Sequence, residues 1–243
     1  KYCSIVKNKL NRLICNMEKN AAAYVVNPKR DFIRKSELSF SKTMRFILGM
    51  GCQTLGKELM DFYSFDAKAV SVSAVVQRRA KILPAAFQDL FKKFNETFSQ
   101  TSFFHGYRLY AVDGSDIHIP TLPDDYGTHY CSNDLSKGYN LMHLNALYDL
   151  MNRRYMDAVL QDSRSENEHS ALILMTNKLK HNSIIVADRG YEAYNTIAHL
   201  ENYGLKYVIR IRTTSGIAQK FNIPVNKETD FTADILLTRR QTN

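Results

Sequence analysis

Residues 183–191 read Ser-Ile-Ile-Val-Ala-Asp-Arg-Gly-Tyr, and residues 107–115 read Tyr-Arg-Leu-Tyr-Ala-Val-Asp-Gly-Ser. Each stretch is a short apolar run that ends in an aspartate, Asp188 or Asp113, followed by turn residues. Short apolar runs bounded in this way are typical of buried strands. The two stretches therefore predict two strands that each bring a carboxylate to a shared edge of one sheet.

Carboxylates at a shared sheet edge are typical of a site for divalent metal ions. Mg²⁺ takes oxygen ligands and is usually held by one or two carboxylates, with substrate phosphates and water around it. Two such ions can stabilise the attacking and leaving oxygens of a phosphodiester. The pattern indicates a Mg²⁺-dependent enzyme, with Mn²⁺ as a substitute, that cuts or joins nucleic acid through Asp113 and Asp188. The spacing alone leaves a second interpretation open, in which both aspartates are turn formers.

The residues around these two strands predict the rest of a mixed sheet. Alternating residues over 142–150 and a segment over 155–161, joined by a turn near Asn152-Arg153, predict an antiparallel hairpin. Ser165-Glu-Asn-Glu168 fits a capping box that opens a helix.

After the Asp188 strand, we expect a helix from about Tyr191 that stops at Gly204, and then a strand over 207–212. The predicted fold class is α/β, with a mixed sheet in the order strand, β-hairpin, helix, strand, helix, strand. The strands around Asp188 should be parallel, and ligands bind outside the carboxyl ends of such strands.

The first hundred residues read as helices and are strongly basic. Helix starts are expected at Thr54, Ser71 and Pro84, and Val72, Val75 and Val76 should face inward. Residues 1–104 hold 18 Lys and Arg against 8 Asp and Glu, whereas residues 105–243 hold 15 against 16. Because neutralisation of phosphates dominates affinity for nucleic acid, this excess predicts a basic helical DNA-binding domain over 1–104.

A group of polar side chains on the second of these helices is the candidate for DNA contact, in the manner of a helix-turn-helix. These side chains are Gln77, Arg78, Arg79 and Lys81. Basic residues near a helix C-terminus also complement the helix dipole, and basic surfaces favour solubility, so both alternatives stay open.

Other classes of protein fit the composition poorly. The apolar runs are far shorter than the roughly 20 residues that span a bilayer, so we expect a cytoplasmic protein without a membrane anchor. Four cysteines are scattered without a Cys-x-x-Cys pair, so no zinc site is expected.

The chain resembles a known family, the DDE transposases of bacterial insertion sequences, in particular the large fourth insertion-sequence family. The similarity rests on Ala111-Val-Asp113-Gly-Ser and, more specifically, on Ala187-Asp188-Arg-Gly-Tyr191. It covers most of the chain from about Arg34 onward. Residues 192–203, 207–210 and 236–241 support it.

This resemblance implies a ribonuclease-H-like catalytic core behind a domain that binds the ends of the mobile element. In this family, Asp, Asp and Glu bind two Mg²⁺ ions that activate water to nick DNA and then the freed 3′ hydroxyl to attack target DNA. Asp113 and Asp188 match the first two acids, Arg189 is a candidate phosphate contact, and Tyr191 is expected to pack. The implied partners are double-stranded DNA, as terminal inverted repeats and target, and a second copy of the chain. The implied location is the bacterial cytoplasm, at the nucleoid when DNA is bound.

The family's third acid is not matched in this sequence. It belongs to a Tyr-x-x-Arg-x-x-x-Glu motif beyond the last core strand, and residues 212–243 contain one glutamate, Glu228, without Tyr and Arg at those offsets. We expect an incomplete core over 105–212 and the start of a β-rich insertion over 213–243, so this chain alone should have little or no strand-transfer activity. Alternative ligands near the first motif are Asp116, His118 and Asp124-Asp125, although such clusters are usually loop formers.

The leading hypothesis is therefore DNA transposition by a metal-dependent DDE transposase. One competitor is another ribonuclease-H-like nuclease that cuts without rejoining, which fits the basic first domain less well. The other is a non-catalytic truncated transposase that binds DNA ends or intact protein as an inhibitor.

Overall fold

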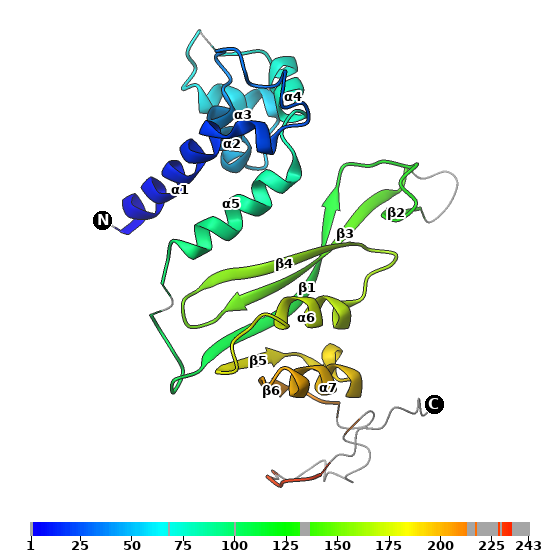
Figure 1. Ribbon diagram of the computed structural model, residues 1–243. Coiled ribbons are helices and arrows are strands. Elements are labelled where there is room, and N and C mark those ends of the chain that lie inside the picture. Colours follow the sequence, from blue (N-terminus) through cyan, green and yellow to red (C-terminus); the bar gives the residue numbers. More distant parts are fainter. Residues whose placement is uncertain are drawn as a thin grey trace. The chain divides into compact units, whose positions relative to one another are not determined.

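The computed structural model describes residues 2–67, 69–99, 101–131 and 137–212, together with Ile217, Glu228 and residues 230–234. The chain divides into two compact units, Lys1–Ser99 and Gln100–Asn243 (Figure 1). Within the described residues, no helix is long and apolar enough to cross a membrane. The predicted β-rich insertion over 213–243 lies almost wholly outside the described residues.

The first unit is helical, as predicted. Its elements are α1 (Tyr2–Lys19), η1 (Ala21–Tyr24), α2 (Phe40–Gly49), α3 (Leu55–Phe62), α4 (Val72–Arg79) and α5 (Pro84–Glu96). The predicted helix starts are confirmed: Thr54 and Ser71 are N-cap residues, and Pro84 is the first residue of α5. The Ser71 side chain accepts a hydrogen bond from the backbone N–H of Ala74, which satisfies a donor that the helix itself leaves free.

Two hydrophobic clusters hold this unit together. One is centred on Ile14, Met17, Phe40, Met44 and Leu90, and the other on Leu38, Phe46, Leu59 and Val75. The prediction that Val72 and Val76 face inward is wrong, because each is 41% exposed. The short helix α4 contacts α2 and α3, and Val75 and the partly buried Ala74 pack into the cluster there.

The second unit is built on one mixed sheet. Its strands are β1 (Arg108–Ile119), β2 (His129–Tyr130), β3 (Tyr139–Asp149), β4 (Arg154–Asp162), β5 (Ser183–Ala187) and β6 (Lys206–Ile209). They lie in the order β2-β3-β1-β5-β6, with β4 also paired to β3. The strands β1, β3 and β4 are antiparallel, whereas β1, β5 and β6 are parallel.

Two helices, α6 (Glu168–Thr176) and α7 (Tyr194–Asn202), pack with this sheet (Figure 1). Leu172 and Met175 of α6 and Leu200 of α7 join a core with buried residues of β1, β3 and β5, among them Tyr110, Val112, Leu147 and Ile185. The predicted order of strand, hairpin, helix, strand, helix and strand is confirmed, and so is the mixed sheet of an α/β fold.

Several boundaries differ from the prediction. The strand β6 ends at Ile209 instead of residue 212, and α7 starts at Tyr194 because residues 189–191 form a separate turn, η2 (Arg189–Tyr191). The strand β1 continues to Ile119, so Asp113 lies within it and not at its end. The strand continues because β3 pairs with β1 as far as Ile119, beyond the last residue that β5 pairs.

Candidate functional site

The parallel pairing of β1 and β5 places the two predicted aspartates side by side. The last pair in their register is Val112 opposite Ala187. Asp113 follows Val112, and Asp188 follows Ala187. Both aspartates are exposed. Although β1 continues, Asp113 stands where its parallel neighbour stops, which is the edge at which ligands bind in such sheets.

The two aspartates differ in their local role. Asp188 is the N-cap of η2, and its Oδ1 accepts a hydrogen bond from the Gly190 N–H at 2.6 Å. Among the described residues, Asp113 accepts a hydrogen bond only from the adjacent Gly114 N–H, at 3.0 Å, and it lies within a regular strand that pairs it with Ala146. The turn-former interpretation therefore describes Asp188 but gives no structural role to Asp113.

A third carboxylate, Glu168, lies between these two motifs. A Cβ atom added to Gly114 would overlap Glu168 Oε1, and one added to Gly190 would lie 3.6 Å from Glu168 Oε2 and 3.0 Å from Asp188 Oδ1. The glycine that follows Asp113 and the glycine two residues after Asp188 thus leave room for the same side chain. The structure brings Glu168 to the edge that the sequence predicted for two carboxylates.

The pattern Ser165-Glu-Asn-Glu168 predicts that Glu168 caps a helix, and it therefore predicts no place for Glu168 in the site. The helix instead begins one residue after Asn167, whose side chain accepts a hydrogen bond from the Ser170 N–H at 2.9 Å. Glu168 is therefore the first residue of α6, and its carboxylate is not used to cap that helix. The signal in the sequence was the pair of glycines, one after each aspartate, since each marks space beside the carboxylates.

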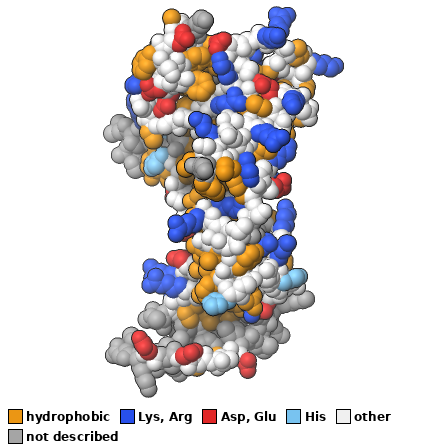
Figure 2. Space-filling view, turned by 90° about the vertical axis from the view of Figure 1, so that its left-hand side faces the viewer, with side chains coloured by type: hydrophobic (Ala, Val, Ile, Leu, Met, Phe, Trp, Pro, Cys, Tyr) orange, Lys and Arg blue, Asp and Glu red, His pale blue; other side chains and the backbone are white. Residues whose placement is uncertain are grey.

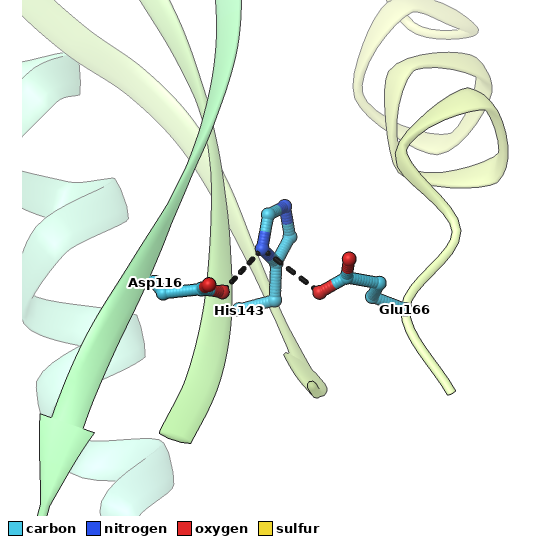
Figure 3. A group of neighbouring side chains, drawn as sticks. All are labelled: Asp116, His143 and Glu166. Atoms are coloured by element: carbon cyan, nitrogen blue, oxygen red, sulfur yellow. Dashed lines mark hydrogen bonds and ion pairs between the residues drawn. The ribbon is translucent and has the colours of Figure 1, made fainter. Parts of the chain in front are cut away.

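A buried histidine, His143, lies between two further acids, Asp116 and Glu166 (Figure 3), and also contacts Glu168. His143 on β3 lies directly opposite Asp116 on β1. Its Nδ1 lies 2.9 Å from Asp116 Oδ1 and 3.1 Å from Glu166 Oε2, and its Nε2 lies 3.2 Å from Glu168 Oε1. Ionised carboxylates only accept hydrogen bonds, so this arrangement favours the imidazolium, which donates from both nitrogens.

The electrostatics agree with a charged ring. Burial lowers the pKa of His143, but the hydrogen bond to Asp116 and the charges of Glu166 and Glu168 raise it by more, so the pKa lies above its ordinary value. Asp116, His143 and Glu166 form the only group of three such side chains, among the described residues, whose ligand atoms lie within 4.8 Å of one another. The distances from His143 Nδ1 to Asp116 and Glu166 are those expected between a protonated imidazole ring and two carboxylates.

Tyr191 contributes a buried hydroxyl to the same region. The side chain is 1% exposed and belongs to the core, as predicted for a packing residue. Its hydroxyl has no hydrogen-bond partner among the described residues. Burial raises the pKa of Tyr191, and the negative charges of Glu168, Asp113 and Asp188 raise it further, because the hydroxyl lies near all three.

The other alternative ligands have ordinary structural contacts. Asp125 accepts a hydrogen bond from the Thr128 hydroxyl at 2.8 Å within the loop that follows β1, as the loop-forming interpretation expects. The ring of His118 lies against Tyr139, with centroids 5.7 Å apart. Glu228 is exposed.

Two of the predicted DNA-contacting side chains also have partners within the first unit. The Arg78 guanidinium lies over the Phe32 ring, 5.0 Å from its centroid, and Lys81 Nζ lies 3.6 Å from Asp31 Oδ1. Gln77 donates to Ser73 Oγ, and Arg79 is exposed. Figure 2 shows Lys and Arg side chains spread over the visible face of this unit. In the second unit, Arg189 is exposed within η2.

Comparison with known proteins identifies the second unit. The family model described as transposase DDE domain matches residues 104–242, more than half of the chain. The chain belongs to the DDE transposase family. The match includes Asp113, Asp188 and Glu168 and excludes the helical unit.

A solved structure is also similar to this DDE transposase chain. It is the crystal structure of a pre-cleavage Mos1 transpososome, with 13% sequence identity and a TM-score of 0.26 over 73% of this chain and 60% of that chain. The present chain thus spans about 60% of the length of that protein chain. The search of curated proteins found no match.

Proposed function

We propose that this chain acts in DNA transposition, as a metal-dependent transposase that binds the ends of an insertion sequence. Asp113 and Asp188 are the proposed metal ligands and catalytic residues, with Mg²⁺ as the natural ion and Mn²⁺ as its substitute. The supporting observation is the register that ends at Val112 and Ala187, which sets the two following aspartates next to each other within a transposase DDE domain.

The donor set of this edge fits a hard divalent ion. Asp113, within β1, and Asp188, directly after β5, offer carboxylate oxygens, the ligands that Mg²⁺ prefers. The buried Tyr191 hydroxyl, which lacks a partner among the described residues, adds a polar atom next to these oxygens. Bound divalent ions would supply charge stabilisation for the attacking and leaving oxygens of a phosphodiester.

The chain's own residues would orient the scissile phosphodiester. Asp113 and Asp188 fix one side of the site through backbone that the sheet holds rigid, and Arg189 offers an exposed guanidinium to a neighbouring phosphate. The basic helical unit supplies the excess positive charge that DNA binding requires, with Gln77, Arg78, Arg79 and Lys81 as proposed contacts. Two DNA ends must meet in transposition, so we propose a homodimer in the DNA complex. Its proposed location is the bacterial cytoplasm.

The test is cleavage of a labelled duplex that carries the terminal inverted repeats of the element encoding this chain. Reactions contain Mg²⁺ or Mn²⁺ and compare the chain with Asp113→Asn, Asp188→Asn and the control Glu201→Gln, whose exposed carboxylate accepts a hydrogen bond from the Tyr207 hydroxyl. Cleavage that is lost in both aspartate variants and kept in the control supports the proposal. Specific binding without cleavage would instead favour a non-catalytic DNA-binding inhibitor.

A further inference from the structure

We propose that Glu168 is a third carboxylate ligand of the metal site formed with Asp113 and Asp188, and that His143, held by Asp116 and Glu166, positions it. This inference rests on the proposed function, because it places a further side chain in the same metal site. It assigns to a residue of α6 a role that the sequence pattern reserves for a glutamate beyond the last core strand.

The position of Glu168 carries the first part of this proposal. Its Oε1 lies against Gly114 and its Oε2 lies near Gly190, so the carboxylate spans the gap between the two aspartate motifs. Two metal ions in one site lie roughly 3.5–4 Å apart, so their ligands need not fall within the coordination sphere of a single ion. A carboxylate between Asp113 and Asp188 is therefore placed to bind an ion together with either aspartate.

The Tyr191 hydroxyl is an independent sign of a bound ligand. It is buried, it lies near all three carboxylates, and it has no partner among the described residues. A buried hydroxyl without a hydrogen bond destabilises the folded state, so native structures nearly always supply a partner. A water bound to a metal ion between the carboxylates would hydrogen-bond with this hydroxyl, since Mg²⁺ usually keeps several of its waters.

The charge of this region also favours a cation. Asp116, Glu166 and Glu168 surround the His143 ring, and Asp113 and Asp188 lie with Glu168 near Tyr191. Among the ion pairs of the described residues, none joins Asp113, Asp188 or Glu168 to a Lys or Arg. Carboxylates crowded in this way repel one another, and divalent cations relieve that repulsion.

His143 is a positioning residue in this arrangement. Its ring is buried, and Nδ1 hydrogen-bonds to Asp116 and lies 3.1 Å from Glu166 Oε2 (Figure 3). On the other side of the ring, Nε2 lies 3.2 Å from Glu168 Oε1. The ring thus fixes one oxygen of Glu168 and leaves Oε2 directed towards Gly190 and Asp188. Histidine–carboxylate contacts of this kind orient metal ligands, and their loss commonly lowers metal affinity about ten- to a hundredfold.

Binding of Mn²⁺ to the whole 243-residue chain tests the proposal without recourse to activity. The free ion is counted by electron paramagnetic resonance during a titration of the parent chain, Glu168→Gln, Asp113→Asn, Asp188→Asn and the control Glu201→Gln. We expect Glu168→Gln to weaken binding about tenfold or more, as each aspartate variant does, while the control binds like the parent chain. Glu168→Asp, which keeps the charge but withdraws the carboxylate, should also weaken binding.

The outcomes separate this inference from the proposed function. If both aspartate variants lose affinity for Mn²⁺ while Glu168→Gln and Glu168→Asp bind it normally, Glu168 is not a ligand. The proposal that Asp113 and Asp188 bind the metal is then still supported. If Asp116→Asn and Glu166→Gln abolish binding while Glu168→Gln does not, the ion lies on the other side of His143 and the inference is wrong. If no variant changes affinity, both proposals fail.

A double-mutant cycle tests the role of His143. In the parent chain, His143→Gln should weaken Mn²⁺ binding about ten- to a hundredfold. In a chain that already carries Glu168→Gln, the same change should add nothing, because His143 acts through Glu168. An equal loss in both backgrounds would show a general structural role and overturn the positioning claim.

Discussion

Acidic side chains have different surroundings in the two units. In the helical unit several of them pair with nearby lysines, as in Lys57 with Asp61, Lys81 with Asp31 and Lys93 with Asp89. At the sheet edge of the second unit, acids gather around one histidine and, in the described part of the chain, form no ion pair with Lys or Arg. Paired acids stabilise a fold, whereas crowded acids destabilise it unless a cation binds. We therefore assign a structural role to the paired acids of the helical unit and a functional role to the crowded acids at the sheet edge.

The largest expected effect is the loss of activity in Asp188→Asn. Loss of one group that stabilises charge in the transition state costs about a hundred- to a thousandfold in rate, so cleavage of an end-bearing duplex should fall by at least that range. Stability without metal should hold or rise, because asparagine keeps the N-cap hydrogen bond to Gly190 while one negative charge leaves the cluster. Rate assays and thermal unfolding of the same preparation measure both effects.

A loss of stability in metal-free Asp188→Asn would contradict the contrast between the two units. The matched change in the helical unit is Asp31→Asn. Asp31 is buried, it pairs with Lys81, and it accepts a hydrogen bond from the Asn27 N–H. Asp31→Asn should therefore lower the free energy of unfolding.

The next effect is steric and separates the glycine beside the acids from a glycine in open space. In Gly114→Ala the new Cβ would overlap Glu168 Oε1 and lie 2.5 Å from His143 Nε2, so both side chains must move. Such overpacking costs about 1–3 kcal/mol, and we expect weaker Mn²⁺ binding as well. Denaturant unfolding and a metal titration measure these two losses.

The control is Gly49→Ala in α2, where an added Cβ meets nothing within 4 Å. It should leave metal binding unchanged and raise stability by up to about 1 kcal/mol, because alanine favours helix. If the two variants behave alike, the space beside Gly114 has no special role.

Physical reasons explain which parts of the site the sequence could predict. The apolar runs before Asp113 and Asp188 predict strands directly, and parallel pairing then fixes the two aspartates as neighbours. Glu168 and His143 depend on side-chain contacts across three elements, namely β1, β3 and α6. Neither residue has a local pattern that distinguishes a ligand from a helix cap or a buried polar side chain.

The same limit explains the wrong orientation predicted for two valines. Helical spacing predicts a shared face for Val72, Val75 and Val76, but only Val75 is buried. How much of a face is covered depends on the helices that pack against it, which the spacing does not specify. The cap at Ser71 was predictable because a cap depends on residues within one turn, whereas Thr54 stands at the N-cap position without a side-chain hydrogen bond to the helix.

A smaller effect is expected for the Tyr191 hydroxyl. Tyr191→Phe removes a buried group that lacks a hydrogen bond among the described residues, so stability without metal should rise by up to about 1–3 kcal/mol. If that hydroxyl hydrogen-bonds a water of a bound ion, the gain in melting temperature on adding Mg²⁺ should be smaller in the variant. Thermal unfolding with and without Mg²⁺ compares the two gains. An equal gain in both chains would remove Tyr191 from the metal site.

The smallest effect tests the paired acids of the helical unit by pH. Hydrogen bonds from Lys93 and then from the Tyr24 hydroxyl hold the pKa of Asp89 below its ordinary value. Because the folded-state pKa is lowered, the contribution of Asp89 is present above its unfolded pKa, about 3.9, and is lost as the pH falls through the folded value. Chemical unfolding between about pH 6 and 3 should therefore show the stability gap between the parent chain and Asp89→Asn closing at the acid end. If the stability difference between the parent chain and Asp89→Asn stays constant with pH, the charge of Asp89 does not stabilise the fold. The contrast with the sheet edge would then depend on the pair of Asp31 and Lys81.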